Sequence, residues 1–142
     1  MIVYFDTSSL LKLFVDETHT EETRNWARAA DAIALSRVTL PEATSAIGRR
    51  HRTGGLTLPS ARRLVSEIAA FWRAATVLEL DEVHAADLAF EHGLRGFDAV
   101  QLAAALTARD NAGAETFAFA SFDLALNRAA RAEGLTVLEP LD

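Results

Sequence analysis

Short apolar runs alternate along the chain with longer segments of helical periodicity, and this alternation limits the folds that the chain can form. It is typical of an α/β domain with a largely parallel sheet. The clearest helical segment, residues 61–72, carries apolar side chains at spacings of three and four, and a second helix starts near Asp98. Five strands are predicted, at residues 2–5, 32–35, 76–80, 116–120 and 135–138.

Length and composition favour one globular domain that covers residues 1–142 and buries a substantial core, since half of the residues are hydrophobic. The chain contains no cysteine, which excludes disulfide scaffolds, thiolate metal sites and thiol nucleophiles. The start lacks the pattern of a signal peptide, and no apolar stretch approaches the roughly 18 residues of a membrane span. We therefore expect a soluble, cytoplasmic protein without a membrane partner.

The charge is acidic overall but unevenly distributed. A net charge of −6 argues against broad, nonspecific affinity for nucleic acids. Five of the 14 basic residues nevertheless lie between positions 49 and 63, with Arg49, Arg50 and Arg52 close together. Composition alone leaves two interpretations open, a solvated helix end or a local patch that contacts phosphates.

Four acidic residues stand where strands end or helices begin. Asp6, Glu42 and Asp123 follow the first, second and fourth predicted strands, and Asp98 opens a helix. Each has an ordinary explanation as a helix cap, and the stretch from Thr39 to Glu42 fits a capping box. Together they have another, because the carboxyl ends of parallel strands share the sheet edge at which such folds bind ligands.

Carboxylates gathered on one edge repel one another, by about 4 kcal/mol for a pair 4 Å apart at an effective dielectric constant of about 20. A bound cation would remove this cost. A site with oxygen ligands only selects a hard ion, Mg²⁺ or Mn²⁺. Such ions can activate a water and stabilise the leaving oxygen in phosphodiester cleavage. Nearby hydroxyls either hold waters and phosphate oxygens or simply cap helices; they belong to Thr7, Ser8 and Ser121.

Four segments, in this order and spacing, resemble the PIN-domain ribonucleases and, among them, the VapC toxins of bacterial toxin–antitoxin pairs. They are IVYFDTSSLLKLF, TLPEATSAIGRR, GFDAVQLAAAL and ASFDLALNRAARAEGL. The resemblance covers essentially the whole chain. It implies a PIN-like α/β fold with a five-stranded, mostly parallel sheet flanked by helices, and an acidic metal site formed by Asp6, Glu42, Asp98 and Asp123.

The resemblance also implies a Mg²⁺- or Mn²⁺-dependent endoribonuclease in which metal-activated water hydrolyses RNA phosphodiester bonds at the four carboxylates. Ser121 and Ser8 would support the site with their hydroxyls. The implied partners are a VapB-like antitoxin and a second copy of the chain. In this light Arg49, Arg50 and Arg52 become candidate RNA contacts. The alternative is a catalytically weak binding module that acts mainly by complexing its antitoxin and operator DNA.

Overall fold

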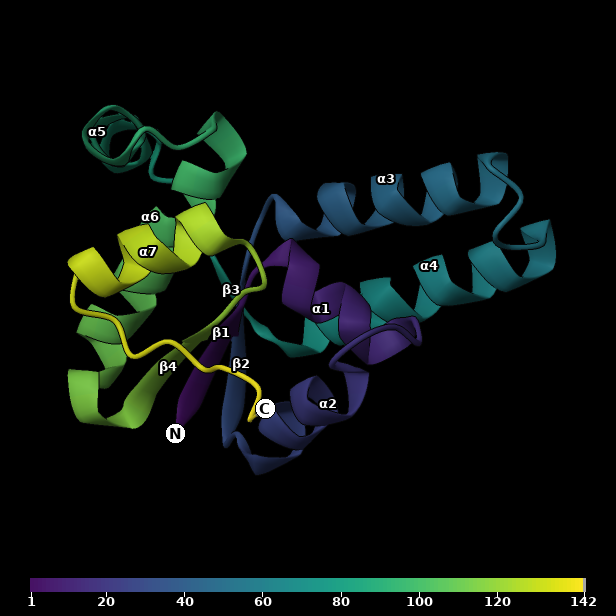
Figure 1. Ribbon diagram of the computed structural model, residues 1–142, viewed down its shortest axis with the longest axis horizontal. Helices are drawn as coiled ribbons and strands as arrows, with labels where there is room; N and C mark the ends of the chain where they lie inside the picture. Colours follow the sequence, from purple (N-terminus) through teal and green to yellow (C-terminus); the bar gives the residue numbers. More distant parts are fainter. Residues whose placement is uncertain (142) are drawn as a thin grey trace.

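The computed structural model describes residues 1–141, which form a parallel four-stranded sheet in the order β3-β2-β1-β4 (Figure 1). The central strand β1 pairs with β2 on one side and with β4 on the other. Both faces of β1 are covered, which explains why its sequence IVYF is apolar throughout. The strands are β1 (Ile2–Phe5), β2 (Ala32–Ser36), β3 (Thr76–Leu78) and β4 (Phe117–Ala120).

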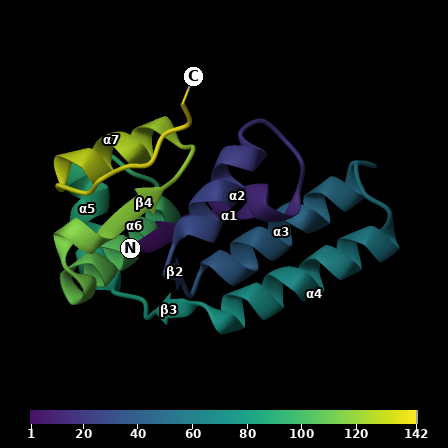
Figure 2. The same ribbon diagram turned by 90° about the horizontal axis from the view of Figure 1, so that it is seen from below.

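Helices cover the two faces of the sheet in two groups (Figures 1 and 2). Val3 and Phe5 pack into a core with the first group, whereas Tyr4 points to the opposite face and packs with the second. The first group is α1 (Thr7–Phe14), α2 (Thr20–Ala29), α3 (Thr39–Arg52) and α4 (Leu58–Ala74). The second is α5 (Glu82–His92), α6 (Gly96–Ala112) and α7 (Leu124–Ala132), and a short 3₁₀ helix, η1 (Ala114–Thr116), precedes β4.

The antiparallel pair α3 and α4 extends away from the sheet in both views (Figures 1 and 2). Helix α3 starts at the edge where the parallel strands end and carries its basic last turn outward. The same helix therefore places Glu42 near the sheet and Arg49 two turns further along.

The strand predictions are confirmed for β1 and, within a residue or two at the ends, for β2, β3 and β4. The prediction of a fifth strand at 135–138 is wrong. In that segment only one parallel bridge forms, between Val137 and Phe119. The backbone N–H of Leu135 is already bonded to the carbonyl of Ala130 at the end of α7, and Pro140 has no N–H to extend the pairing.

None of the helices in residues 1–141 has the length and apolar character that crossing a bilayer requires.

Two glycines flank the turn that delivers Asp98 to the sheet edge, and they have different roles. Gly93 caps α5 in the left-handed conformation (φ 65°), whereas Gly96 opens α6 outside that region and has open space around its missing Cβ. We expect Gly93→Ala to lower the free energy of unfolding by about 1 kcal/mol or more. Gly96→Ala should leave it unchanged or raise it by about 0.4–1 kcal/mol. Urea unfolding of both variants checks this, and equal losses would contradict it.

Candidate functional site

The register of β1 and β4 brings Asp6 and Ser121 together. Phe5 pairs with Ala120, so the residues that follow on each strand meet at the sheet edge. The Asp6 N–H donates to the Ala120 carbonyl at 3.1 Å, and the Ser121 hydroxyl donates to Asp6 Oδ2 at 2.6 Å. Strand pairing thus brings together two residues that are 115 positions apart in the sequence.

The Asp6 carboxylate is buried and held by hydroxyl and backbone donors. Ser9 donates to it from both its N–H and its hydroxyl at 3.0 Å, and the Ser8 hydroxyl donates at 2.7 Å. Burial raises the pKa of the Asp6 carboxyl, and the hydrogen bonds from Ser121, Ser9 and Ser8 act in the opposite direction. Asp6 is therefore the N-cap of α1, as its position suggests, and also an anchor for the loop after β4.

Neither Ser8 nor Ser121 acts as a helix cap. The Ser8 hydroxyl donates to Asp6 and accepts from the Phe122 N–H at 3.0 Å. The Ser121 hydroxyl likewise accepts from the Asp123 N–H at 3.1 Å. Both hydroxyls tie the carboxylate to the backbone that leads into α7, which fits a supporting role.

The capping-box prediction for Glu42 is wrong. Helix α3 has Val38 at its N-cap position, and no side chain caps it. The Glu42 carboxylate instead accepts hydrogen bonds from the Thr7 hydroxyl and from the Gln101 amide, both at 2.9 Å. Residues from α1 and α6 therefore hold Glu42 in place from opposite sides of the sheet edge.

Gln101 is a buried connector behind Glu42. Its amide nitrogen lies 3.1 Å from the Thr7 hydroxyl and 3.2 Å from that of Thr39, and its oxygen accepts from the Tyr4 hydroxyl. Burial raises the pKa of Tyr4 well above its usual value, so this hydroxyl stays protonated and remains a donor. The network orients Glu42 without any positive charge.

Asp98 and Asp123 differ in their local roles. Helix α6 starts at Gly96, so Asp98 lies inside its first turn and its predicted N-cap role is wrong. Asp123 does cap α7, where its carboxylate accepts from the Leu126 N–H at 2.8 Å. Both carboxylates benefit from the positive ends of helix dipoles.

Glu42, Asp98 and Asp123 line one cavity of about 550 Å³. Partial burial and the charges of Asp123 and Glu42 raise the pKa of Asp98, and the nearby Arg95 opposes this only in part. Three of the four predicted acids thus line one cavity, and the charges of two of them act on Asp98. Asp6 is not part of the cavity wall; it is buried and hydrogen-bonded to Ser121.

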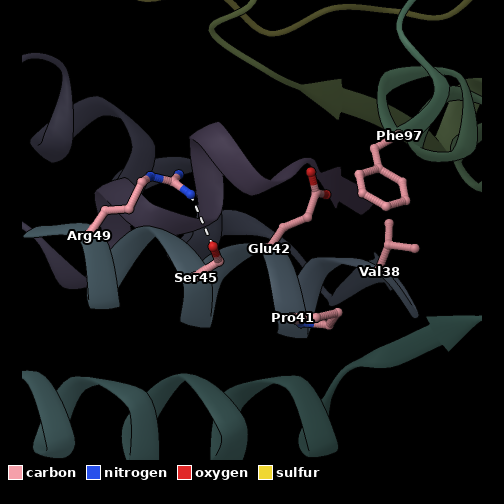
Figure 3. Close-up of a pocket in the computed structure, with 6 residues that line it drawn as sticks. All are labelled: Val38, Pro41, Glu42, Ser45, Arg49 and Phe97. Carbon is pink, nitrogen blue, oxygen red and sulfur yellow. Dashed lines mark hydrogen bonds between the residues drawn. The ribbon is translucent and has the colours of Figure 1, made fainter.

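A second cavity of about 300 Å³ adjoins the first and shares Glu42 and Phe97 with it (Figure 3). Glu42, Ser45 and Arg49 follow one another along one face of α3, and Arg49 donates to the Ser45 hydroxyl at 3.0 Å. The acidic cavity is thus continuous with a second cavity that is lined by Arg49.

The donor set of the first cavity fits a hard divalent cation. Its carboxylates are oxygen ligands without sulfur. Burial and then the charges of Asp123 and Glu42 raise the pKa of Asp98, and a cation would relieve the repulsion between these carboxylates.

A separate group brings possible ligand atoms within 4.8 Å of one another: Glu91 and His92 at the end of α5, and Glu133 after α7. The His92 ring lies 2.7 Å from the Glu133 carboxylate, which gives the two a structural role as a pair. None of the four predicted acids belongs to this group.

The basic cluster is divided by the fold. Arg49 lines the second cavity. Arg50 instead forms an ion pair with Glu17 at 2.9 Å, and Arg52 is exposed at the end of α3. Of the three predicted RNA contacts, Arg49 is the one that the structure places beside the acids.

Sequence reasoning missed four residues of this region: Tyr4, Arg95, Phe97 and Gln101. Arg95 and Phe97 directly precede Asp98, so their proximity to the site was available from the sequence. The role of Gln101 was recognisable only as a polar residue within the apolar run AVQLAAAL.

Comparison with known proteins gives a consistent result. The model of the PIN domain family matches residues 3–132. Ribonuclease VapC45 of Mycobacterium tuberculosis (strain CDC 1551 / Oshkosh) is 37% identical over 112 residues, which cover 77% of this chain and 78% of the relative. Among solved structures, PAE2754 from Pyrobaculum aerophilum matches 96% of this chain and 83% of its own, with a TM-score of 0.68 and 20% identity. A toxin–antitoxin complex from Klebsiella pneumoniae contains a chain that matches with a TM-score of 0.65 and 18% identity, over 99% of this chain and 98% of that one.

The buried network around Gln101 can be tested by removing its polar groups. Gln101→Leu keeps a similar volume but leaves the Tyr4 hydroxyl and the Glu42 carboxylate short of a partner. We expect a loss of about 1–3 kcal/mol in the free energy of unfolding for each buried group left unsatisfied. Urea unfolding measures this free energy. The double variant Tyr4→Phe, Gln101→Leu should lose less free energy of unfolding than the two single variants lose in total. Fully additive losses would contradict the network.

Proposed function

The chain belongs to the PIN domain family as a VapC-like protein, and on this premise we propose that it is a metal-dependent endoribonuclease toxin of a VapBC-type pair. The observation that carries the proposal is the shared cavity of Glu42, Asp98 and Asp123. Three carboxylates on one open cavity repel one another, beyond the local structural roles of Glu42 and Asp123. Carboxylate oxygens are the ligands that Mg²⁺ and Mn²⁺ prefer, and a bound ion would offset the repulsion.

In this proposal Glu42, Asp98 and Asp123 would hold the ion at the cavity, and Asp6 would add the fourth carboxylate of the site. Asp6 also accepts hydrogen bonds from the hydroxyls of Ser121 and Ser8. These hydroxyls accept from the N–H groups of Asp123 and Phe122 and so position the loop that leads to Asp123. When bound, the ion would supply Lewis-acid activation of water and charge stabilisation at the phosphate. The four residues are thus the proposed catalytic and metal set.

The protein's own contribution is orientation. Thr7 and Gln101 hold Glu42 with neutral donors, so its negative charge stays available to a ligand. The N-terminal ends of α6 and α7 present Asp98 and Asp123 on rigid elements rather than on free loops. Such preorganisation reduces the cost of arranging charge during the reaction.

The proposed substrate is RNA, in keeping with the ribonuclease relative. A polyanion approaches an acidic cavity only if nearby cations compensate, and Arg49 and Arg95 line the two adjoining cavities. A VapB-like antitoxin and a homodimer remain predicted partners. The toxin–antitoxin complex among the structural neighbours supports the first.

The alternative proposal, a catalytically weak module that binds antitoxin and operator DNA, predicts no need for an open acidic cavity. The two proposals therefore separate on metal-dependent cleavage.

The first test is cleavage of RNA by the purified protein in Mg²⁺ or Mn²⁺ and in EDTA. We expect cleavage that requires the metal and falls by at least about 100-fold in Asp98→Asn, because the change removes a metal ligand. Asp87→Asn, at an exposed acid of α5, is the matched control and should cleave like the wild type.

A second readout does not depend on activity. Mg²⁺ at about 100 times its dissociation constant should raise the free energy of unfolding by about 2.7 kcal/mol in the wild type, and Asp98→Asn should lose this increase at the same concentration. Metal-bound but inactive wild-type protein would favour the binding module. Cleavage that survives EDTA would contradict the proposed mechanism.

The division of the basic cluster predicts unequal effects. Arg49→Gln should reduce the slope of log binding affinity against log salt by about 1, because a phosphate contact is lost. Arg50→Gln should change the slope less, since Arg50 is already paired with Glu17. Fluorescence anisotropy with single-stranded RNA measures both, and equal slopes in all three proteins would contradict a role for Arg49.

A further inference from the structure

We propose that Phe97 is a stacking platform that holds one nucleobase of the RNA beside the acidic cavity; this inference rests on the proposed function and adds a residue that positions the substrate. Phe97 is the second residue of α6 and directly precedes Asp98. Its side chain lines both the acidic cavity and the adjoining cavity (Figure 3). It is the aromatic residue that connects the two.

The exposure of Phe97 is the first argument. The residue is 62% exposed, although apolar positions on both faces of the sheet are packed. The ring lies beside Val38 in Figure 3 and keeps much of its surface open. An aromatic face in this state can accept a flat partner without any rearrangement of the core.

The charges around Phe97 are the second argument, because they indicate which partner. Its two cavities contain the acids Glu42, Asp98 and Asp123 and the cations Arg49 and Arg95. The centres of protein–protein interfaces are depleted in charged residues, so this mixture disfavours a protein as the occupant. It suits a strand whose phosphates meet the cations and whose base meets the ring.

The order of the groups is the third argument. Along α3, Arg49 lies two turns beyond Glu42, and Phe97 lies on the opposite side of Glu42 in Figure 3. Arg95, one residue before Gly96, lines the acidic cavity. Phe97 thus shares one cavity with Arg49 and the other with Arg95, an arrangement that offers a single strand phosphate contacts as well as a base contact.

The experiment measures apparent KM and kcat for cleavage of a fluorescein-labelled, random-sequence single-stranded RNA of about 12 nucleotides. Loss of base stacking should raise the apparent KM of Phe97→Ala by about 5- to 150-fold. Phe97→Trp should restore it. Phe97→Leu, which keeps an apolar side chain but lacks a π face, should not. Phe90→Ala is the matched control, because Phe90 is 95% exposed on α5 and lines neither cavity.

An abasic ribose-phosphate oligomer of the same length, used as a competitor, isolates the base contact. It should inhibit the wild type and Phe97→Ala equally, since it offers phosphates but no base to stack. An unchanged KM in Phe97→Ala would overturn the stacking role while leaving the nuclease proposal in place. A wild-type KM in Phe97→Leu would overturn the stacking role too. So would a change in the oligomeric state of Phe97→Ala that accompanies the rise in KM. Absence of metal-dependent cleavage by the wild type would overturn the proposed function itself, and the stacking role with it.

Discussion

The pairing of β1 with β4 is the constraint on which the site depends. It sets Phe5 opposite Ala120 and therefore Asp6 beside Ser121. A register shift of one residue would turn every side chain of the strand to the other face, burying the wrong set and separating this pair. The same carboxylate caps α1 through the Ser9 N–H. The strand register, the start of α1 and the position of Asp6 thus depend on one set of contacts.

The four acids are held in place by different physical means. Asp6 and Glu42 are held by neutral donors, which compensate for lost hydration without cancelling the negative charge. Asp98 and Asp123 stand at helix N-termini, where the dipoles favour anions. These contributions let the fold tolerate the burial and the repulsion that together raise the pKa of Asp98, and they leave a net negative cavity. If arginines neutralised the acids, the repulsion would be smaller, but the cavity would no longer attract a cation.

Four of the five predicted strands form, and three of the four predicted acids line one cavity, because both outcomes depend on local pattern and on the geometry of parallel sheets. Prediction from the sequence failed where a competing partner decided the outcome. The segment 135–138 has strand composition, yet its pairing is limited to one bridge because Leu135 is engaged with α7. Glu42 has the spacing of a capping box, but Gln101, 59 positions away, takes it as an acceptor. Long-range polar contacts of this kind leave no periodic signal.

The structure also bears on how a chain of net charge −6 would hold a polyanion. Coulomb attraction from a wide basic surface is not available, because part of the basic cluster is already committed, as the pair of Arg50 with Glu17 shows. The cations that line the two cavities, Arg49 and Arg95, can place phosphates but contribute little long-range attraction. Affinity then has to come from contacts that do not depend on net charge. An exposed aromatic ring beside the acids meets this need, since stacking is independent of salt to first order and tolerates any base. In the proposed binding mode, the exposed ring of Phe97 would therefore supply affinity that the acidic net charge of the protein does not.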